Sequence, residues 1–299
     1  MSDGLWVIGV SRRTITAVGT EDRTVGPRVG ARLTDPASAV LSDLPDWATR
    51  VLAPNPGPMT LTGTNSWVLR APGAADCVVV DPGPADEEHL AALAAEHPSL
   101  VLVTHGHPDH VEGLARFRDR TGARVVAADP ALADESPVDG AVVEAAGLRI
   151  GVLATPGHTR DSLCFVVGAD APVGVLTGDT VLGAGTTVVM WPDGDLGAYL
   201  ASLARLGALA GVPALPGHGP ALADCAAAAD FYLAHRTARL DQVRAALAAG
   251  ASGVDGVVDA VYPDVDPGVR PAAELTVRAQ LAYLGDREHI RPPEPLDRT

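Results

Sequence analysis

The stretch THGHPDHVEG, residues 104–113, places His105, His107, Asp109 and His110 within six consecutive positions. It follows the apolar run LVLVT (100–104), which is typical of a buried strand, so the polar side chains leave the end of that strand. Pro108 suits the first position of a following helix, where its missing N–H costs nothing. Histidine is the commonest metal ligand and a carboxylate is a frequent partner, so the stretch predicts a metal site rather than a solvated polar loop.

Three later motifs supply the ligands that a single loop cannot. TPGHT (155–159) carries His158, LTGDT (176–180) carries Asp179, and LPGHGP (215–220) carries His218, each where a predicted strand ends. A lone loop histidine is more often structural, but this recurrence at strand ends favours metal binding. Five imidazoles and two carboxylates suit two zinc-like ions about 3.5 Å apart, bridged by a shared carboxylate or a hydroxide. The other histidines, His89, His97, His235 and His289, are expected in surface or packing roles.

Strands and helices alternate in two blocks, roughly 60–140 and 145–222, which predicts sheets covered by helices. Strands are expected at 66–71, 77–83, 100–104, 123–129, 147–155, 162–168 and 174–179, with a short strand and terminal loop at 212–219. Helices are expected at 86–97, 111–122 and 197–209. Three further helices are expected at 226–250, 253–262 and 271–284. We therefore expect an N-terminal extension of unclear structure (1–45), a catalytic domain (46–222) and a helical C-terminal module (223–299).

The bulk composition limits the partners. The net charge is −15 and no basic stripe stands out, which argues against stable binding of duplex DNA. Cys77, Cys164 and Cys225 match no zinc motif and are expected to be reduced. No apolar run approaches the length of a membrane span, and the N-terminal residues have the wrong charge order for a secretory signal. We therefore expect a cytoplasmic protein with no membrane partner, and the oligomeric state stays open, with a homodimer as one option.

The ordered set of seven ligands resembles the metallo-β-lactamase superfamily over roughly residues 50–290. The resemblance implies an α/β fold, an αββα sandwich with a dinuclear site at one edge of its two sheets. It also implies that His105, His107 and His158 hold one metal ion and that Asp109, His110 and His218 hold the other, with Asp179 bridging them. Exported β-lactamases and glyoxalase-II-like thioesterases are poorer matches.

A narrower resemblance rests on PNPGPMTLTGTNSWVL (54–69), GDTVLGAGTTVV (178–189), LPGHGP and VRAQLAYLGDREHI (277–290). These segments are similar to the β-lactamase-like protein 2 branch of the superfamily. That resemblance implies a small winged-helix-like C-terminal module and endonuclease action on single-stranded RNA. Fungal relatives imply an alternative activity, that of thioesterases which release polyketides from carrier proteins.

We expect a dinuclear zinc-dependent hydrolase in which a metal-bridging hydroxide attacks a phosphodiester of single-stranded RNA. The alternative is a thioesterase or other acyl-ester hydrolase acting on a small-molecule substrate, and iron or manganese could replace zinc. An iron-dependent persulfide dioxygenase and a non-catalytic, metal-stabilised binding protein are weaker alternatives. Asp109 and Asp179 are the catalytic candidates, because they could orient the hydroxide or carry a proton.

Two sets of side chains are candidates for contact with the substrate. Those proposed to line the pocket are Thr60, Thr62, Asn65, Thr186 and Thr187, with turn and capping chemistry as the alternative. Arg236, Arg239 and Arg244 on the long helix could supply a positive face for RNA, although such arginines are usually solvated.

Overall fold

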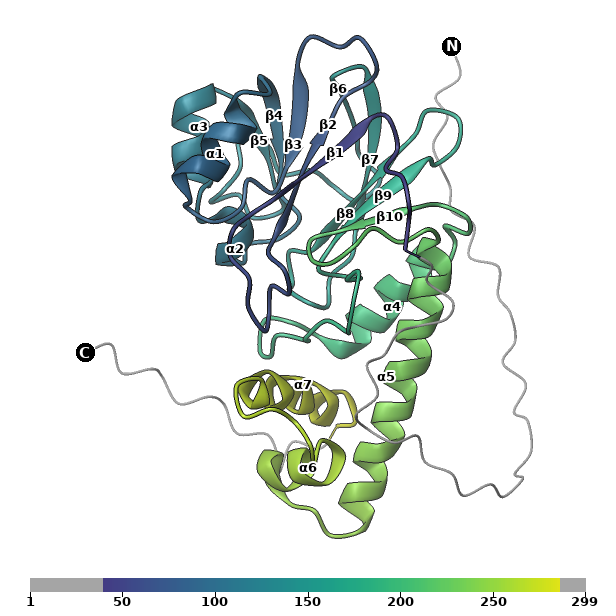
Figure 1. The fold of residues 1–299 in the computed structure, drawn as a ribbon. Helices are drawn as coiled ribbons and strands as arrows, with labels where there is room; N and C mark the ends of the chain where they lie inside the picture. The colour runs from purple at the N-terminus through teal and green to yellow at the C-terminus, as the bar shows by residue number, and fades with distance from the viewer. Residues whose placement is uncertain (1–39, 286–299) are drawn as a thin grey trace.

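A computed structural model describes residues 40–285 of the chain (Figure 1). The N-terminal extension expected over residues 1–45 therefore lies almost entirely outside the described residues, as does His289. None of the helices in the described part of the chain combines the length and apolar character needed to cross a bilayer.

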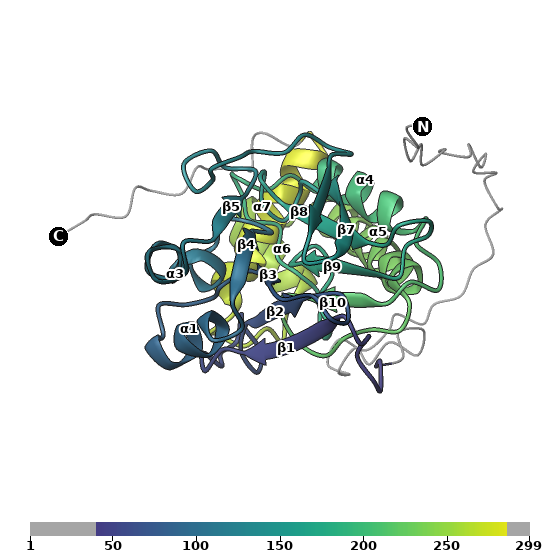
Figure 2. The same ribbon diagram turned by 90° about the horizontal axis from the view of Figure 1, so that it is seen from above.

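Two five-stranded mixed sheets face each other at the centre of the molecule (Figures 1 and 2). The first has the order β1 (Ala48–Leu52), β2 (Asn65–Leu69), β3 (Cys77–Val80), β4 (Pro98–Leu102), β5 (Arg124–Val126). The second has the order β10 (Ala214–Pro216), β9 (Gly174–Gly178), β8 (Leu163–Val167), β7 (Leu148–Ala154), β6 (Val142–Ala145). Strands β3, β4 and β5 pair in parallel, as do β9 and β10, and the other neighbours are antiparallel.

Helices cover the outer face of each sheet. Alternate residues of the first sheet, such as Val79 and Val101, pack outward against α1 (Glu87–Ala94) and α3 (Leu114–Thr121). The intervening residues, such as Trp67, pack inward against the second sheet and Phe165. On the far side, α4 (Leu196–Leu206) and α5 (Cys225–Ala248) bury the outer face of the second sheet. The predicted αββα sandwich is confirmed, and burial on both faces explains the continuous apolar strands.

Four strands lie at the edges of the two sheets, and two of them, β5 and β10, are mostly buried. The other two edge strands, β1 and β6, were not predicted from the sequence. Each pairs on one side only, and most of its residues are exposed or half-buried, so neither shows a continuous apolar run. The helix expected at 111–122 is instead two helices, α2 (Pro108–Val111) and α3, separated at Gly113. Gly113 packs against the 83–84 turn, where an added Cβ would lie 2.8 Å from the Pro84 carbonyl oxygen.

The C-terminal module consists of α5, α6 (Gly253–Val261) and α7 (Arg270–Tyr283), and its helical character is confirmed. Residues 223–285 contain no strand, so no β-wing accompanies the helices in this part of the chain. The first half of α5 packs in the core of the second sheet through residues such as Ala229 and Tyr232. Its second half packs against α6 and α7 through Val243. The helix α5 therefore belongs to both cores and joins them.

Candidate metal centre

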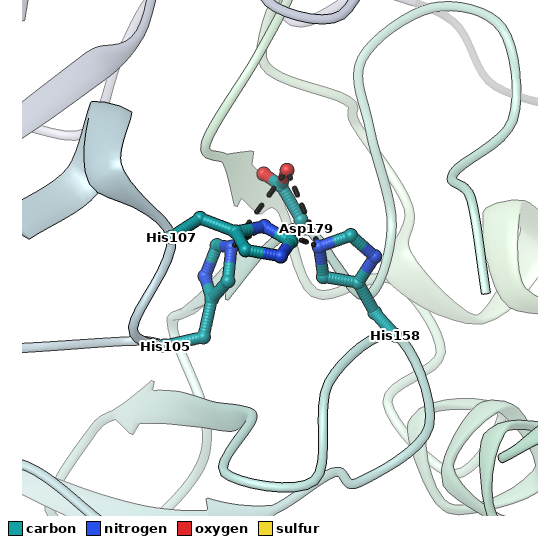
Figure 3. Close-up of side chains that lie close together, drawn as sticks. All are labelled: His105, His107, His158 and Asp179. Carbon is teal, nitrogen blue, oxygen red and sulfur yellow. Dashed lines mark hydrogen bonds and ion pairs between the residues drawn. The ribbon is translucent and has the colours of Figure 1, made fainter. Parts of the chain in front are cut away.

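The seven side chains singled out from the sequence converge in two groups at one edge of the sandwich. One group contains His105, His107, His158 and Asp179 (Figure 3), and the other contains Asp109, His110 and His218. Within each group the potential ligand atoms all lie within 4.8 Å of one another. His105 and His107 follow β4, His158 follows β7, Asp179 follows β9 and His218 follows β10, while Asp109 and His110 lie in α2, with Pro108 at its start as predicted.

Glycines allow these strand ends to approach closely. Gly178 has a φ of +47°, and an added Cβ there would lie 2.7 Å from the Thr104 side chain. An added Cβ at Gly217 would lie 2.5 Å from Oδ1 of Asp179. A side chain at either position would push apart the segments that carry the ligands.

Within the first group, Nδ1 of His107 lies 2.9 Å from Nε2 of His105 and 3.1 Å from Nε2 of His158. Asp179 faces both groups. Its Oδ2 lies 3.8 Å from Nε2 of His158 and 3.3 Å from Nε2 of His218, and its Oδ1 lies 3.5 Å from Nε2 of His110. This is the position that a bridging carboxylate would need.

Hydrogen bonds outside the ligand groups fix the tautomers of the imidazoles. Nδ1 of His158 lies 2.6 Å from the carbonyl oxygen of Val188, and Nδ1 of His218 lies 3.3 Å from that of Gly63. A carbonyl oxygen only accepts, so Nδ1 carries the hydrogen and Nε2 of each neutral ring presents a lone pair to its group. Such partners orient metal-binding histidines in general.

Asp81, which the sequence analysis did not single out, fixes two further histidines. Its Oδ2 accepts from Nδ1 of His110 at 2.8 Å and from the Thr104 hydroxyl at 2.6 Å, and its Oδ1 accepts from the Thr104 backbone N–H. Since the Thr104 hydroxyl donates to Asp81, its oxygen accepts from Nδ1 of His105, 3.0 Å away. The available signal was the motif DPG (81–83), a polar residue directly after a buried strand. Thr64, also not predicted, donates to Oδ2 of Asp109 at 2.8 Å.

The local environment lowers the pKa of some histidines at the site and raises that of others. Burial lowers the pKa of His158 to about 4 and that of His105 well below its usual range, so both rings are neutral. Burial also opposes the charged form of His110, but Asp179 and Asp81 outweigh it and raise the pKa to about 9. Hydrogen bonds to Asp109 and Asp179 likewise outweigh burial and raise the pKa of His218 to about 10. The carboxylates thus hold positive charge on two imidazoles, which is the charge that a bound cation would replace.

The hydrogen bonding of Asp179 indicates further that these residues suit metal ions. Oδ1 of Asp179 is buried and accepts no hydrogen bond from the described part of the protein. A buried carboxylate oxygen without a donor is costly unless a cation lies beside it. The surrounding donors are imidazole nitrogens and carboxylate oxygens, a set that suits zinc and also iron or manganese.

A pocket of about 220 Å³ opens beside Asp179 and His158. Its walls come from the loop after β1, from the segment 182–188 and from the start of α7. The lining residues include Pro58, Met59, Leu61, Leu182, Ala184, Gly185, Val188, Val269 and Ala272. Two of the predicted pocket residues, Thr186 and Thr187, also line it.

The other three pocket candidates lie elsewhere. The Thr60 hydroxyl donates to the Asn55 carbonyl oxygen, which is turn chemistry. Asn65 is buried, and its amide donates to the carbonyl oxygens of Pro216 and Gly219, so it supports the loop that carries His218. Thr62 is exposed and does not contribute to the pocket walls.

The positive helix face suggested by three arginines is not formed. Arg236 is buried, with 2% of its surface exposed, and points into the protein. Arg239 lies over the Tyr262 ring, 4.6 Å from its centroid, and Arg244 pairs with Asp241 on the same helix. The guanidinium groups of Arg239 and Arg244 are therefore occupied by contacts within the module, and that of Arg236 by the Tyr199 ring and the Thr187 carbonyl oxygen outside it.

A family model described as the metallo-beta-lactamase superfamily matches residues 59–139. The beta-lactamase-like protein 2 homolog of Caenorhabditis elegans is 31% identical over 262 residues, which cover 82% of this chain and 86% of the relative. A metallo-beta-lactamase family protein from Thermus thermophilus has the same fold, with a TM-score of 0.65, 24% identity and coverage of 83% of this chain and 96% of that one.

Two fungal relatives are named atrochrysone carboxyl ACP thioesterase. The one from Aspergillus chevalieri is 33% identical over 259 residues, covering 80% of this chain and 81% of the relative. The one from Aspergillus fumigatus is 38% identical over 181 residues, covering 57% of this chain and 55% of the relative.

Proposed function

The chain belongs to the metallo-β-lactamase superfamily, and we propose that this metal-dependent hydrolase cleaves thioesters that carry an apolar acyl group. The observation that carries the proposal is the composition of the pocket beside the ligands. Side chains such as Met59, Leu61, Leu182 and Val188 form its walls, and no arginine within residues 40–285 lines it. Apolar walls favour an acyl chain, because burial of its methylene groups supplies the binding energy.

A phosphodiester backbone needs different surroundings. Proteins that bind single-stranded nucleic acid place cationic side chains along the backbone and aromatic rings against the bases. Apart from the ligand His158, the described residues of the pocket walls include neither, and the net charge of −15 works against a polyanion. The names of the two fungal thioesterases support acyl chemistry instead. Single-stranded RNA, the substrate predicted first from the sequence, becomes the comparison substrate of the test.

The chain's own carboxylates have different parts in this proposal. Two ions held by the seven ligands would supply an activated water and a clamp for the charge that develops on the carbonyl oxygen. Asp179 is the more deeply buried carboxylate, with 10% of its side chain exposed, and it keeps its charge between the two groups. Asp109 has 26% of its side chain exposed and is oriented by Thr64, so it can pass the proton of the consumed water to the departing thiolate.

In the test, the metal-loaded protein is incubated with N-acetylcysteamine thioesters that have short or long acyl chains. A labelled single-stranded RNA is incubated with the protein in parallel. We expect hydrolysis of the thioesters, an intact RNA and a loss of at least about 100-fold in turnover in Asp179→Ala. Cleaved RNA with intact thioesters, in a protein that holds its metal, would refute the proposal.

A pocket variant sharpens the test. Ala272→Phe should fill the space between α7 and the 182–188 segment and raise KM for the long acyl chain about tenfold, with the acetyl thioester unaffected. Ala238→Phe is the matched control, because Ala238 is exposed on α5 and does not contribute to the pocket walls. Equal effects on both chain lengths would show that the acyl group lies elsewhere.

A further inference from the structure

Two side chains of α5, Tyr232 and Arg236, reach from the C-terminal module to the 182–188 segment that forms one wall of the pocket. They are one helical turn apart and therefore point in the same direction. The Tyr232 hydroxyl donates to the Gly185 carbonyl oxygen at 3.0 Å and accepts from the Leu182 backbone N–H at 3.0 Å. The Arg236 guanidinium donates to the Thr187 carbonyl oxygen. The segment is thus held at both ends by one helix.

The surroundings of Arg236 are unusual for a buried cation. Within residues 40–285 its guanidinium has no carboxylate partner, and its Nε has no hydrogen-bond acceptor. It instead lies over the Tyr199 ring, 5.3 Å from the centroid, and donates to Thr187. A buried charge without a counter-ion is costly, and an apolar side chain of the same size would pack there without that cost. The cost points to a role for the contact with Thr187.

The next contacts lead from Thr187 to a metal ligand. The Thr187 hydroxyl lies 3.2 Å from Nδ1 of His158, and the adjacent Val188 carbonyl oxygen lies 2.6 Å from the same nitrogen. Both acceptors sit within one residue of the carbonyl that Arg236 holds. They fix the His158 tautomer, in which Nε2 presents its lone pair to the first ligand group.

Tyr199 supports the same histidine from a second side. An added Cβ at Gly157, the residue before His158, would lie 2.3 Å from Cα of Tyr199, so the helix α4 backbone touches this turn. The Tyr199 hydroxyl donates to the carbonyl oxygen of Thr180, which follows Asp179. The Tyr199 ring, covered by Arg236, is therefore wedged between the segments that carry two ligands of the first group.

We propose that Arg236 is a positioning residue: through the 187–188 segment it sets the orientation of His158 and thereby makes the C-terminal module part of the first ligand group. The second group contains Asp109, His110 and His218, and α5 reaches it through Tyr232 instead: the Tyr232 hydroxyl holds Leu182 and Gly185, and the N–H of Gly183 between them donates to the His218 carbonyl oxygen at 2.8 Å. The contact of Arg236 with Thr187 leads only to His158 among the described residues. The inference concerns metal binding and does not depend on the substrate, so it stands or falls separately from the proposed thioesterase activity.

The test is a titration of the metal-free protein with cobalt(II), followed by its visible absorption, in Arg236→Met, Arg236→Lys and Arg244→Met. His158→Ala and His218→Ala identify which binding step belongs to which group. Loss of a side chain that orients a metal-binding histidine typically costs about 10- to 100-fold in affinity. We therefore expect Arg236→Met to weaken the His158 step at least about tenfold, to change its absorption spectrum and to leave the His218 step within about twofold. Arg244→Met, which removes an exposed arginine of the same helix, should change neither step.

The Arg236→Lys variant distinguishes a positioning role of Arg236 from a role in packing alone. Lysine keeps a cationic donor near Thr187 but loses the planar fork, so the His158 step should fall between the wild-type and Arg236→Met values. The same variant carries the test if Arg236→Met does not fold, because a weakened His158 step with an intact His218 step is then the expected result. Unchanged steps in both Arg236 variants, or equal weakening of both steps, would overturn the inference.

Discussion

Replacing Asp81 with asparagine should disable the second ligand group while leaving the backbone undisturbed. The change conserves size, and Asp81 has a φ of +54°, a conformation that asparagine tolerates well. Asparagine retains one acceptor oxygen, but its amide nitrogen can only donate. Its oxygen can hold only one of the two positions of the Asp81 oxygens. If that oxygen accepts from the Thr104 backbone N–H, as Oδ1 of Asp81 does, the amide nitrogen faces the Thr104 hydroxyl and Nδ1 of His110, the two donors from which Oδ2 of Asp81 accepts.

The consequence is a change of tautomer at His110. An amide N–H that faces Nδ1 favours the ring with its hydrogen on Nε2, the nitrogen directed at Asp109 and His218. That nitrogen then presents a hydrogen where a lone pair is needed. The lost hydrogen bond from an imidazole to a buried carboxylate is worth about 1.5–3 kcal/mol, which corresponds to roughly 10- to 150-fold in affinity for the ion.

The assay is competition between the protein and a chelator for zinc, with each binding step followed separately. Asp81→Asn should weaken the step assigned to His218 by roughly 10- to 150-fold. The step assigned to His158 should also weaken, but less, because Asp81 reaches His105 only through Thr104. Asp119→Asn, the same change at an exposed position on α3, should leave both steps unchanged. Wild-type zinc affinity in Asp81→Asn would refute the tautomer argument.

Three further outcomes follow from the geometry. Gly157→Ala should lower the free energy of unfolding by about 3 kcal/mol, because φ is +142° and the new Cβ meets the α4 backbone. The control is Gly151→Ala, whose new Cβ would lie 3.7 Å from its nearest neighbour, and it should lower the free energy of unfolding by under about 1 kcal/mol. Equal melting temperatures of the two variants would contradict this prediction. Metal binding at pH 7.5 should release about one to two protons from His110 and His218, because the pKa values of both imidazoles are raised. The affinity for the metal ion should therefore rise with pH up to about 9. Calorimetry in buffers with different heats of ionisation measures the proton release, and the absence of release would contradict the prediction. Removal of metal by a chelator should lower the melting temperature by roughly 10 °C, and an unchanged melt would show that the ligand groups do not bind an ion tightly.

The sequence predicted the inner strands and the seven converging side chains because both have local signals. Inner strands are buried on both faces and read as apolar runs, and every one of the seven side chains except His110 has a glycine or proline next to it in the sequence. The edge strands β1 and β6 lack such runs because most of their residues are exposed or half-buried. Asp81 and Thr64 lie near the ligands only after folding: Asp81 is 29 residues from His110, and Thr64 is 45 residues from Asp109. Tertiary contacts at that separation leave no periodic trace in a single sequence.

Arg236 is different, because its burial could have been read from the helix itself. The buried positions of α5 include Cys225, Ala229, Tyr232, Arg236, Leu240 and Val243, which follow one another at intervals of three or four residues. Arg236 thus lies within the apolar stripe, whereas Arg244 lies outside it and is exposed. An arginine in the buried stripe of a helix needs an acceptor on whatever packs against that stripe, and here the acceptor is the segment beside His158. The same periodicity that predicts a helix can therefore indicate which of its charged residues contacts the site.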